Sequence, residues 1–268
     1  TYFLALRIFE DHGLRVHGVT TDGAGLVPDA LREDLRELRP VMLYSVPTHQ
    51  NPSGTTMPEE RRRAVAALCR QHGVLLVADE VYHLLTFAGE PPRPLAAQAA
   101  EGGLLSLGSF SKILAPGLRL GWVQGAPDLL RRLSTCGFLD SGGGLGPFTS
   151  AVVRSLMETG AQEAHLERLR GIYGARARAM AASLERSLAG RASWAPPAGG
   201  FFFWLALAGL QDSAVLLGRS RSRGVTFAPG ARFSTRGGQG DHLRLSFSYY
   251  DEERIAQGVA RLAAALPA

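Results

Sequence analysis

Short apolar runs alternate with segments of helical periodicity along the first half of the chain. Each run is bounded by proline, glycine or small polar residues, which is typical of a strand buried on both faces of a parallel sheet. The intervening segments carry helix signals, with Pro28 in one first turn and Gly73 after another last turn. This alternation predicts an α/β domain with a mostly parallel sheet flanked by helices. The expected strands are Val41–Val46, Val74–Ala78 and Leu104–Leu107, and the expected helices are Pro28–Leu38 and Pro58–His72.

The remaining segments follow weaker patterns. A helix over Thr1–Phe9 and a strand over Leu14–Thr20 are expected before the alternation starts. A long amphipathic helix with apolar positions from Leu166 to Leu188 is typical of a bridge between two layers or domains. We therefore predict a large domain over residues 1–160, and a bridging helix with a smaller α+β domain over 161–268. In these later parts we expect a helix over Pro127–Leu133, a flexible loop over Ser141–Gly146, and strands over Phe201–Leu205, Val225–Phe227 and Leu243–Phe247.

Polar residues follow the predicted strands at the points where the strands end. Asn51 lies in the turn after the first strand, Asp79 directly follows the second, and Ser109, Ser111 and Lys112 follow the third. In open α/β sheets, ligands bind at the carboxyl ends of the strands. The sequence therefore predicts that these three groups meet around one small molecule.

Lys112 is the sole lysine among 29 lysines and arginines. A lysine amine can lose its proton when desolvated and attack a carbonyl, which a guanidinium cannot do. By itself, Lys112 is equally consistent with an ordinary surface lysine in an arginine-rich chain. Its neighbours favour chemistry, because an aldehyde ligand with a phosphate and a pyridine ring gives each of them a role.

In that hypothesis Lys112 forms a Schiff base with the aldehyde and later acts as the base that moves the substrate's α-proton. Asp79 keeps the ring nitrogen protonated, because a nearby carboxylate raises the pKa of a cation. The other polar groups bind the rest of the molecule: Asn51 and Tyr82 the phenolic oxygen, and Ser109, Ser111 and Arg119 the phosphate. Arg119 lies among apolar residues, which favours a buried partner.

Composition argues against several other classes of protein. No apolar stretch approaches the ~18 residues of a membrane span, so no membrane partner is expected. The net charge of +5 is spread among acidic residues, which argues against nucleic acid as a partner. Cys69 and Cys136 form no metal or disulfide motif, and the histidines lack ligand spacing, so we expect no metal and a cytoplasmic location.

Four motifs lie along the chain, at Asn51–Gly54, Asp79–Tyr82, Ser109–Lys112 and Pro116–Trp122. Their order and spacing resemble those of the class I/II aminotransferases, which are pyridoxal-phosphate enzymes of fold type I. The 2-aminoadipate/kynurenine branch is the most similar, and the resemblance extends from Thr1 to the C-terminus. Landmarks of the same family lie at Gly199–Phe201 and Pro229–Gly230.

The resemblance implies a pyridoxal 5'-phosphate-dependent aminotransferase that moves an amino group between an amino acid and a 2-oxo acid, as a homodimer. It implies that Arg244 binds the substrate α-carboxylate and that Tyr2 stacks on the pyridine ring. Each of these two has a simpler interpretation, since Arg244 alternates with apolar residues like the solvent face of a strand and Tyr2 is an aromatic near the end of the chain. The family's N-terminal region does not precede Thr1, so we expect further residues upstream.

Two other functions remain open at this point. A sibling pyridoxal-phosphate enzyme such as a C–S lyase would use the same residues for another reaction. An aminotransferase-like sensor domain of a transcriptional regulator would bind cofactor or amino acid behind a DNA-binding module. We favour the enzyme, because nothing in the chain has the pattern of a nucleic-acid site.

Overall fold

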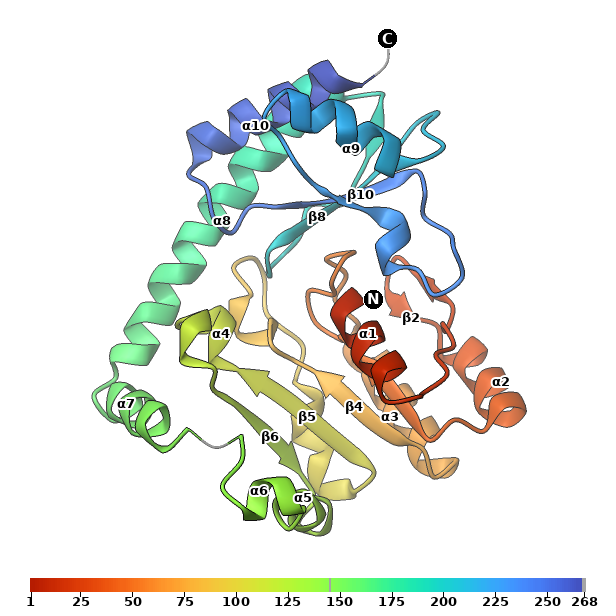
Figure 1. Ribbon diagram of the computed structural model, residues 1–268, viewed down its shortest axis with the longest axis vertical. Helices are drawn as coiled ribbons and strands as arrows, with labels where there is room; N and C mark the ends of the chain where they lie inside the picture. Colours follow the sequence, from red (N-terminus) through yellow and green to blue (C-terminus); the bar gives the residue numbers. More distant parts are fainter. Residues whose placement is uncertain (145, 267–268) are drawn as a thin grey trace.

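The computed structural model describes residues 1–144 and 146–266. A four-stranded sheet lies in the first half of the chain. The strand order is β3-β4-β5-β6, with the first three strands parallel and β6 antiparallel to β5 (Figure 1). This confirms the mostly parallel sheet, while β6 is a strand that the sequence pattern did not reveal. The strands are β3 (Met42–Ser45), β4 (Leu75–Asp79), β5 (Leu104–Ser109) and β6 (Gly121–Gly125).

Two amphipathic helices lie beside this first sheet, where one packs on β4 and the other packs on that helix. Leu31 and Leu35 of one helix and Val65 and Leu68 of the other join a core with the strand residue Leu76. Burial of these leucines and valines stabilises the layer by roughly 1.5–3 kcal/mol for each side chain. The two helices are α2 (Pro28–Leu38) and α3 (Glu59–Gln71).

The segment before α2 differs from its sequence-based expectation. Residues 14–20 contain no strand, and Leu14 and Val16 are exposed, so the strand expected there is wrong. Among the described residues, no strand pairs with this segment, so its alternating pattern forms no sheet. A small two-stranded ribbon follows instead, and α1 precedes the segment: α1 (Phe3–Asp11), β1 (Thr21–Asp22) and β2 (Gly25–Leu26).

Short helices connect the strands and lead out of the first sheet. The helix expected at Pro127 is present, and most of the glycine-rich stretch that follows forms turns, although Leu145 lies outside the described residues. These elements are η1 (His83–Leu85), η2 (Leu95–Glu101), α4 (Phe110–Ile113), η3 (Pro116–Leu118), α5 (Pro127–Ser134), α6 (Gly137–Asp140) and α7 (Pro147–Glu158).

The second sheet is antiparallel and has the order β7-β8-β10-β9. Its core joins the strands to α9, α10 and the long helix α8 (Ala161–Leu188), with Phe203, Leu205 and Leu243 almost fully buried. Residues 225–227 form no strand, and the pairing with β10 begins only at Ala228. The elements are β7 (Ala192–Ser193), β8 (Phe202–Leu207), α9 (Ser213–Ser222), β9 (Ala228–Pro229), η4 (Gly230–Phe233), β10 (His242–Ser246) and α10 (Glu252–Ala265).

The bridging helix is α8 (Ala161–Leu188), which runs from α7, beside the first sheet, to α10, over the second (Figure 1). A third apolar cluster lies between the two sheets and includes Val46, Tyr82, Phe110 and Phe202. The division into domains at residue 160 remains a prediction. Within residues 1–144 and 146–266, no helix has the length and apolar character needed to cross a bilayer.

Candidate active site

Lys112 lies on the short helix α4, directly after β5, at the carboxyl edge of the first sheet. Burial lowers the pKa of its amine, the negative charge of Asp79 raises it, and Arg119 and Arg244 lower it again. The net lowering increases the fraction of unprotonated amine, which is the nucleophilic form. These influences also place Lys112 among the groups that the sequence analysis assigned to one site.

Asp79 is the last residue of β4, and its two carboxylate oxygens have different surroundings. Oδ2 accepts a hydrogen bond from the hydroxyl of Tyr44 at 2.5 Å, whereas Oδ1 is buried and has no partner among the described residues. Burial raises the pKa of this carboxyl, and the Tyr44 hydroxyl, the nearby Val81 amide and Lys112 oppose that rise, although the Val81 amide forms no hydrogen bond of normal geometry with either oxygen. A buried, unpaired carboxylate oxygen is costly, so its position indicates a site for a cationic donor.

Arg244 comes from β10 of the second sheet and reaches Asn51 at the edge of the first. Its Nη1 donates to Asn51 Oδ1 at 2.5 Å, and its guanidinium lies 3.9 Å from the ring centre of Phe202. Burial lowers its pKa to about 10. The interpretation of Arg244 as the solvent face of a strand is therefore wrong. Its Nε is buried without a partner in the described part of the chain, which leaves a donor for an anion.

Asn51 and the two tyrosines complete the group of residues brought together here. Asn51 is only 3% exposed and Tyr82 only 6%, and the Tyr82 ring packs edge-on against Phe201 and Phe202. Burial raises the pKa of Tyr2, as does Asp79, while Arg244 and Arg119 lower it. Tyr2 directly precedes α1. The site therefore combines residues from the carboxyl ends of three strands, from the start of α1 and from β10.

The three residues expected to bind a phosphate make contacts that do not by themselves indicate a ligand. Ser109 accepts a hydrogen bond from the Ser111 amide at 3.1 Å and so caps α4, as a loop serine satisfying its own backbone would. Arg119 is exposed, adopts φ of +51°, and donates to Pro116 O at 3.2 Å. The expectation of a buried partner for Arg119 is wrong, because its side chain is exposed and bonds to its own turn. A role at a phosphate remains a prediction for all three.

Two residues near the site were missed by sequence reasoning. Tyr44 was counted as part of an apolar strand, and Gln162, which donates to Ile113 O at 3.0 Å beside Lys112, as part of the bridging helix. Tyr44 had a usable signal, because a phenol is a donor side chain that also fits a half-buried strand. Gln162 had none, since its contact joins elements 49 residues apart.

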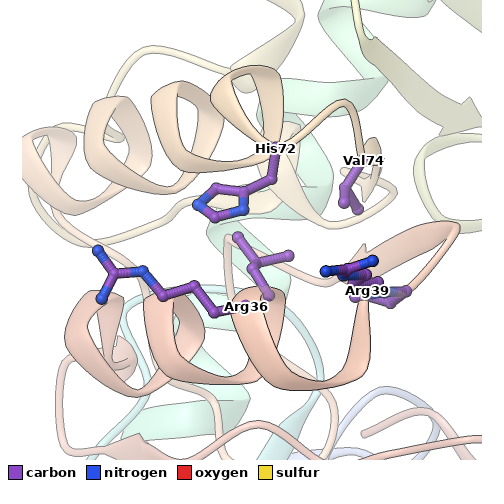
Figure 2. A pocket seen from close by; sticks show the side chains of 6 residues that line it. Arg36, Arg39, His72 and Val74 are labelled. Atoms are coloured by element: carbon purple, nitrogen blue, oxygen red, sulfur yellow. The ribbon is translucent and has the colours of Figure 1, made fainter.

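The hollow in Figure 2 is separate from this site. It has a volume of about 370 Å³ and lies between the last turns of α2 and α3, lined by Arg36, Arg39 and His72 among others. Val74 and Pro40, which also line it, precede β4 and β3. It is therefore at the amino edge of the first sheet, opposite Asp79, and none of the predicted site residues lines it.

The residues present fit a pyridoxal-type cofactor. Lys112 supplies an amine with a lowered pKa, Asp79 an unpaired buried oxygen suited to a protonated ring nitrogen, and Arg244 an unpaired donor suited to a carboxylate. No group of three histidine, cysteine or acidic side chains in the described part of the chain is arranged to hold a metal ion. The arrangement suits chemistry that stabilises negative charge next to an amine.

Comparison with known proteins agrees with this interpretation of the site. The family model for aminotransferases of class I and II matches residues 1–262. The chain belongs to this aminotransferase family. Its solved relatives share the same α/β architecture, and the resemblance to the family noted from the motifs is confirmed.

Three individual relatives show the range of this aminotransferase family. An aromatic-amino-acid aminotransferase of Thermococcus litoralis is 33% identical over 98% of this chain and 64% of its own length. The crystal structure of LysN, an α-aminoadipate aminotransferase of Thermus thermophilus complexed with N-(5'-phosphopyridoxyl)-L-leucine, is 33% identical with a TM-score of 0.91, over 99% of this chain and 68% of LysN. An uncharacterised HTH-type transcriptional regulator of Bacillus subtilis, YisV, is 30% identical over 97% of this chain and 53% of YisV.

The chain therefore spans between about half and two-thirds of the length of these three relatives. The α-aminoadipate enzyme agrees with the branch that the motifs indicate. The regulator matches one of the alternatives left open by the sequence. Identity near 30% shows the family, and the reaction of the whole protein has to be argued from the site.

Proposed function

We propose that the protein is a pyridoxal 5'-phosphate-dependent aminotransferase that exchanges the amino group of an amino acid for the oxygen of a 2-oxo acid. The single observation that carries this proposal is the meeting of Lys112, with its lowered pKa, and the unpaired Oδ1 of Asp79 beside Arg244. The α-aminoadipate aminotransferase among the relatives supports it.

Each residue then has a defined task. When bound, the cofactor supplies an electron sink for the carbanion formed at the substrate's α-carbon. Lys112 Nζ would hold the cofactor covalently, and once the incoming amine had displaced it, the free Lys112 amine would take and return the α-proton. Asp79 Oδ1 holds the proton on the ring nitrogen, because an ionised neighbour stabilises that cation.

The remaining residues bind and orient. Arg244 binds the substrate α-carboxylate through its planar fork, and Phe202 and Phe233 hold the guanidinium in place. Asn51 and Tyr82 donate to the phenolic oxygen of the cofactor, and Tyr2 covers the ring. Ser109, Ser111 and Arg119 bind the phosphate. These roles extend to this chain the assignments that its motifs imply.

The covalent attachment has a direct test, because the chain has one lysine. Treatment with pyridoxal phosphate and then borohydride should add the cofactor's mass to the peptide containing Lys112. Lys112→Arg should remove that tagged peptide. Labelling restricted to the terminal amine, or equal labelling after the substitution, would contradict the assignment.

The reaction is tested with a ¹⁵N-labelled amino donor and a panel of 2-oxo acids. Transfer of the label into a new amino acid, with one equivalent of 2-oxo acid formed from the donor, is the expected result. Release of ammonia with a cleaved C–S bond would indicate a lyase. Cofactor binding without turnover would favour a sensor domain like that suggested by the relationship to YisV.

We also propose that the protein acts as a homodimer on small amino acids and 2-oxo acids in the cytoplasm. The family relationship supports the substrates, and Cys69 and Cys136, which form no disulfide, fit a reducing compartment. Sedimentation equilibrium would test the dimer.

A further inference from the structure

Tyr44 lies beside Asp79 because of the register between two parallel strands. It is paired with Val77 of β4, and Asp79 is two residues further along that strand. Side chains two residues apart point to the same face of a sheet, so Tyr44 and Asp79 share a face. The Tyr44 hydroxyl donates to Asp79 Oδ2 at 2.5 Å, and its ring packs edge-on against Phe9 at 5.5 Å.

We propose that Tyr44 is a positioning residue for Asp79, one that engages Oδ2 and so presents Oδ1 to the ring nitrogen of the cofactor. This inference rests on the function proposed above. The evidence is the contrast between the two oxygens of one carboxylate, since one has a short hydrogen bond and the other is buried with no partner among the described residues. A carboxylate held at one oxygen cannot exchange its two oxygens by rotation without breaking that bond.

The direction of the Tyr44 bond is fixed by the charges around it. Burial raises the pKa of the Tyr44 phenol, as does the charge of Asp79, so the hydroxyl keeps its proton and only donates toward Asp79. Donation to the charged form of a carboxyl stabilises that form, which counteracts the effect of burial on Asp79. The other ionisable groups acting on Asp79 or near it are Lys112 on α4, Glu80 after β4, and Tyr2 and Tyr82.

The test is Tyr44→Phe, which keeps the ring and removes the hydroxyl. We expect kcat to fall on the order of tenfold, as for other groups that orient a reacting ligand, with KM for the amino donor nearly unchanged. Because Asp79 would protonate more readily, the acid limb of the kcat profile should move to higher pH. The matched control is Tyr173→Phe, another half-buried tyrosine, whose ring packs against Phe201 at 4.9 Å.

A second measurement needs no turnover. In the cofactor-free protein, ¹³C NMR of labelled aspartate should show a higher pKa for the Asp79 carboxyl in Tyr44→Phe than in the parent, with the resonance assigned from Asp79→Asn. The affinity for pyridoxal phosphate, measured by equilibrium dialysis, should fall severalfold in Tyr44→Phe and remain unchanged in Tyr173→Phe.

A double-mutant cycle separates positioning from general packing. If Tyr44 acts through Asp79, adding Tyr44→Phe to Asp79→Asn should cost little further cofactor affinity. Additive losses, or an unchanged Asp79 pKa in Tyr44→Phe, would overturn the inference while leaving the proposed function intact. Failure of the parent protein to bind pyridoxal phosphate would instead overturn the proposed function, and the NMR titration would still decide whether Tyr44 controls Asp79.

Discussion

Two polar clusters lie next to each other in this protein, one around Glu80 and one around Asp79, yet their hydrogen bonding differs. Glu80 accepts from the amides of Leu95 and Ala96 and from the hydroxyl of Ser106. Arg62, whose side chain is fully buried, lies 3.5 Å from Glu80. The neighbouring carboxylate of Asp79 has one oxygen bonded and one with no partner in the described part of the chain.

The guanidinium groups of the two clusters differ in the same way. Arg62 donates to Met57 O at 2.7 Å, to Pro47 O at 2.9 Å and to Thr48 Oγ1 at 2.7 Å. Arg244 donates to Asn51, and its buried Nε has no partner within residues 1–144 and 146–266. Buried polar groups are normally satisfied, so the Arg62 cluster is a complete structural unit, whereas the Asp79 cluster leaves an acceptor and a donor available for the ligand that we propose.

The Arg62 cluster also holds the backbone of the Asp79 cluster in place. Its bonds from Arg62 fix both ends of the segment 47–57, which carries Asn51, while Glu80 fixes the backbone next to Asp79. Substitutions in the Arg62 cluster should therefore mainly lower stability, and substitutions in the Asp79 cluster should mainly lower activity. Substitutions in each cluster test that separation.

The largest expected effect is the loss of activity in Lys112→Arg. The guanidinium stays protonated, so it can neither hold the cofactor covalently nor move the α-proton, and turnover should fall by at least about 10³-fold. The urea midpoint of unfolding should be unchanged or higher, because Lys112 is partly desolvated in the native state. Residual turnover near the parent rate would contradict the role of this lysine.

Arg62→Met should produce the largest loss of stability. Removing one partner of a buried ion pair leaves Glu80 without its counter-charge, and the free energy of unfolding should fall by about 3–5 kcal/mol in urea titrations. The matched control is Arg63→Met, because Arg63 is exposed and paired with Glu59, and such pairs contribute little. Equal effects for the two substitutions would show that the cluster is not a structural unit.

Stability should also decrease in mild acid because of His49. Its ring is 2% exposed, contacts Thr86 Oγ1 at 2.7 Å, and has its pKa lowered by burial to about 4. A lowered pKa in the folded state means that protonation favours unfolding. Above pH 6.5, the approximate pKa of an unfolded histidine, His49 does not reduce stability. As pH falls from there toward 4, the free energy of unfolding should fall by about 3 kcal/mol.

The measurement is the free energy of unfolding at pH 7 and at pH 4.5. The loss between these values should be smaller in His49→Gln than in the parent, and unchanged in His72→Gln, because His72 is exposed. His83, whose pKa is also lowered mainly by burial, acts in the same direction in all three proteins. Identical losses in His49→Gln and the parent would exclude His49 as the cause.

Arg244→Lys has the smallest expected effect of these substitutions, and that effect should be limited to substrate binding. An ammonium cannot reproduce the planar fork, so KM for the amino donor should rise about tenfold to a hundredfold. Stability should change little, because the native guanidinium is incompletely bonded. The control is Arg232→Lys, an exposed arginine stacked over Phe3 at 4.3 Å. A change in cofactor affinity without a change in KM would assign Arg244 to the cofactor instead.

Local sequence patterns were sufficient to predict an element where the residues of that element alone determine its structure. Pro28–Leu38 was expected as a helix and is one, because Pro28 in its first turn and its apolar spacing are contained in its own residues. The buried strands ending near Ser45 and Asp79 were found because parallel strands covered on both faces are continuously apolar. The strand β6 was missed, since Gly121–Gly125 is an exposed edge strand with no such run.

The sequence alone determined the kinds of chemistry available: one amine, carboxylates and hydroxyls after strands, and an arginine late in the chain. Only the tertiary structure decided which of their atoms are used. The Tyr44–Asp79 bond depends on strand register, and the Arg244–Asn51 bond joins residues 193 positions apart. Hydrogen bonds between distant elements depend on how the sheets pack, and for that reason the unpaired oxygen of Asp79 could not be predicted from the residues around it.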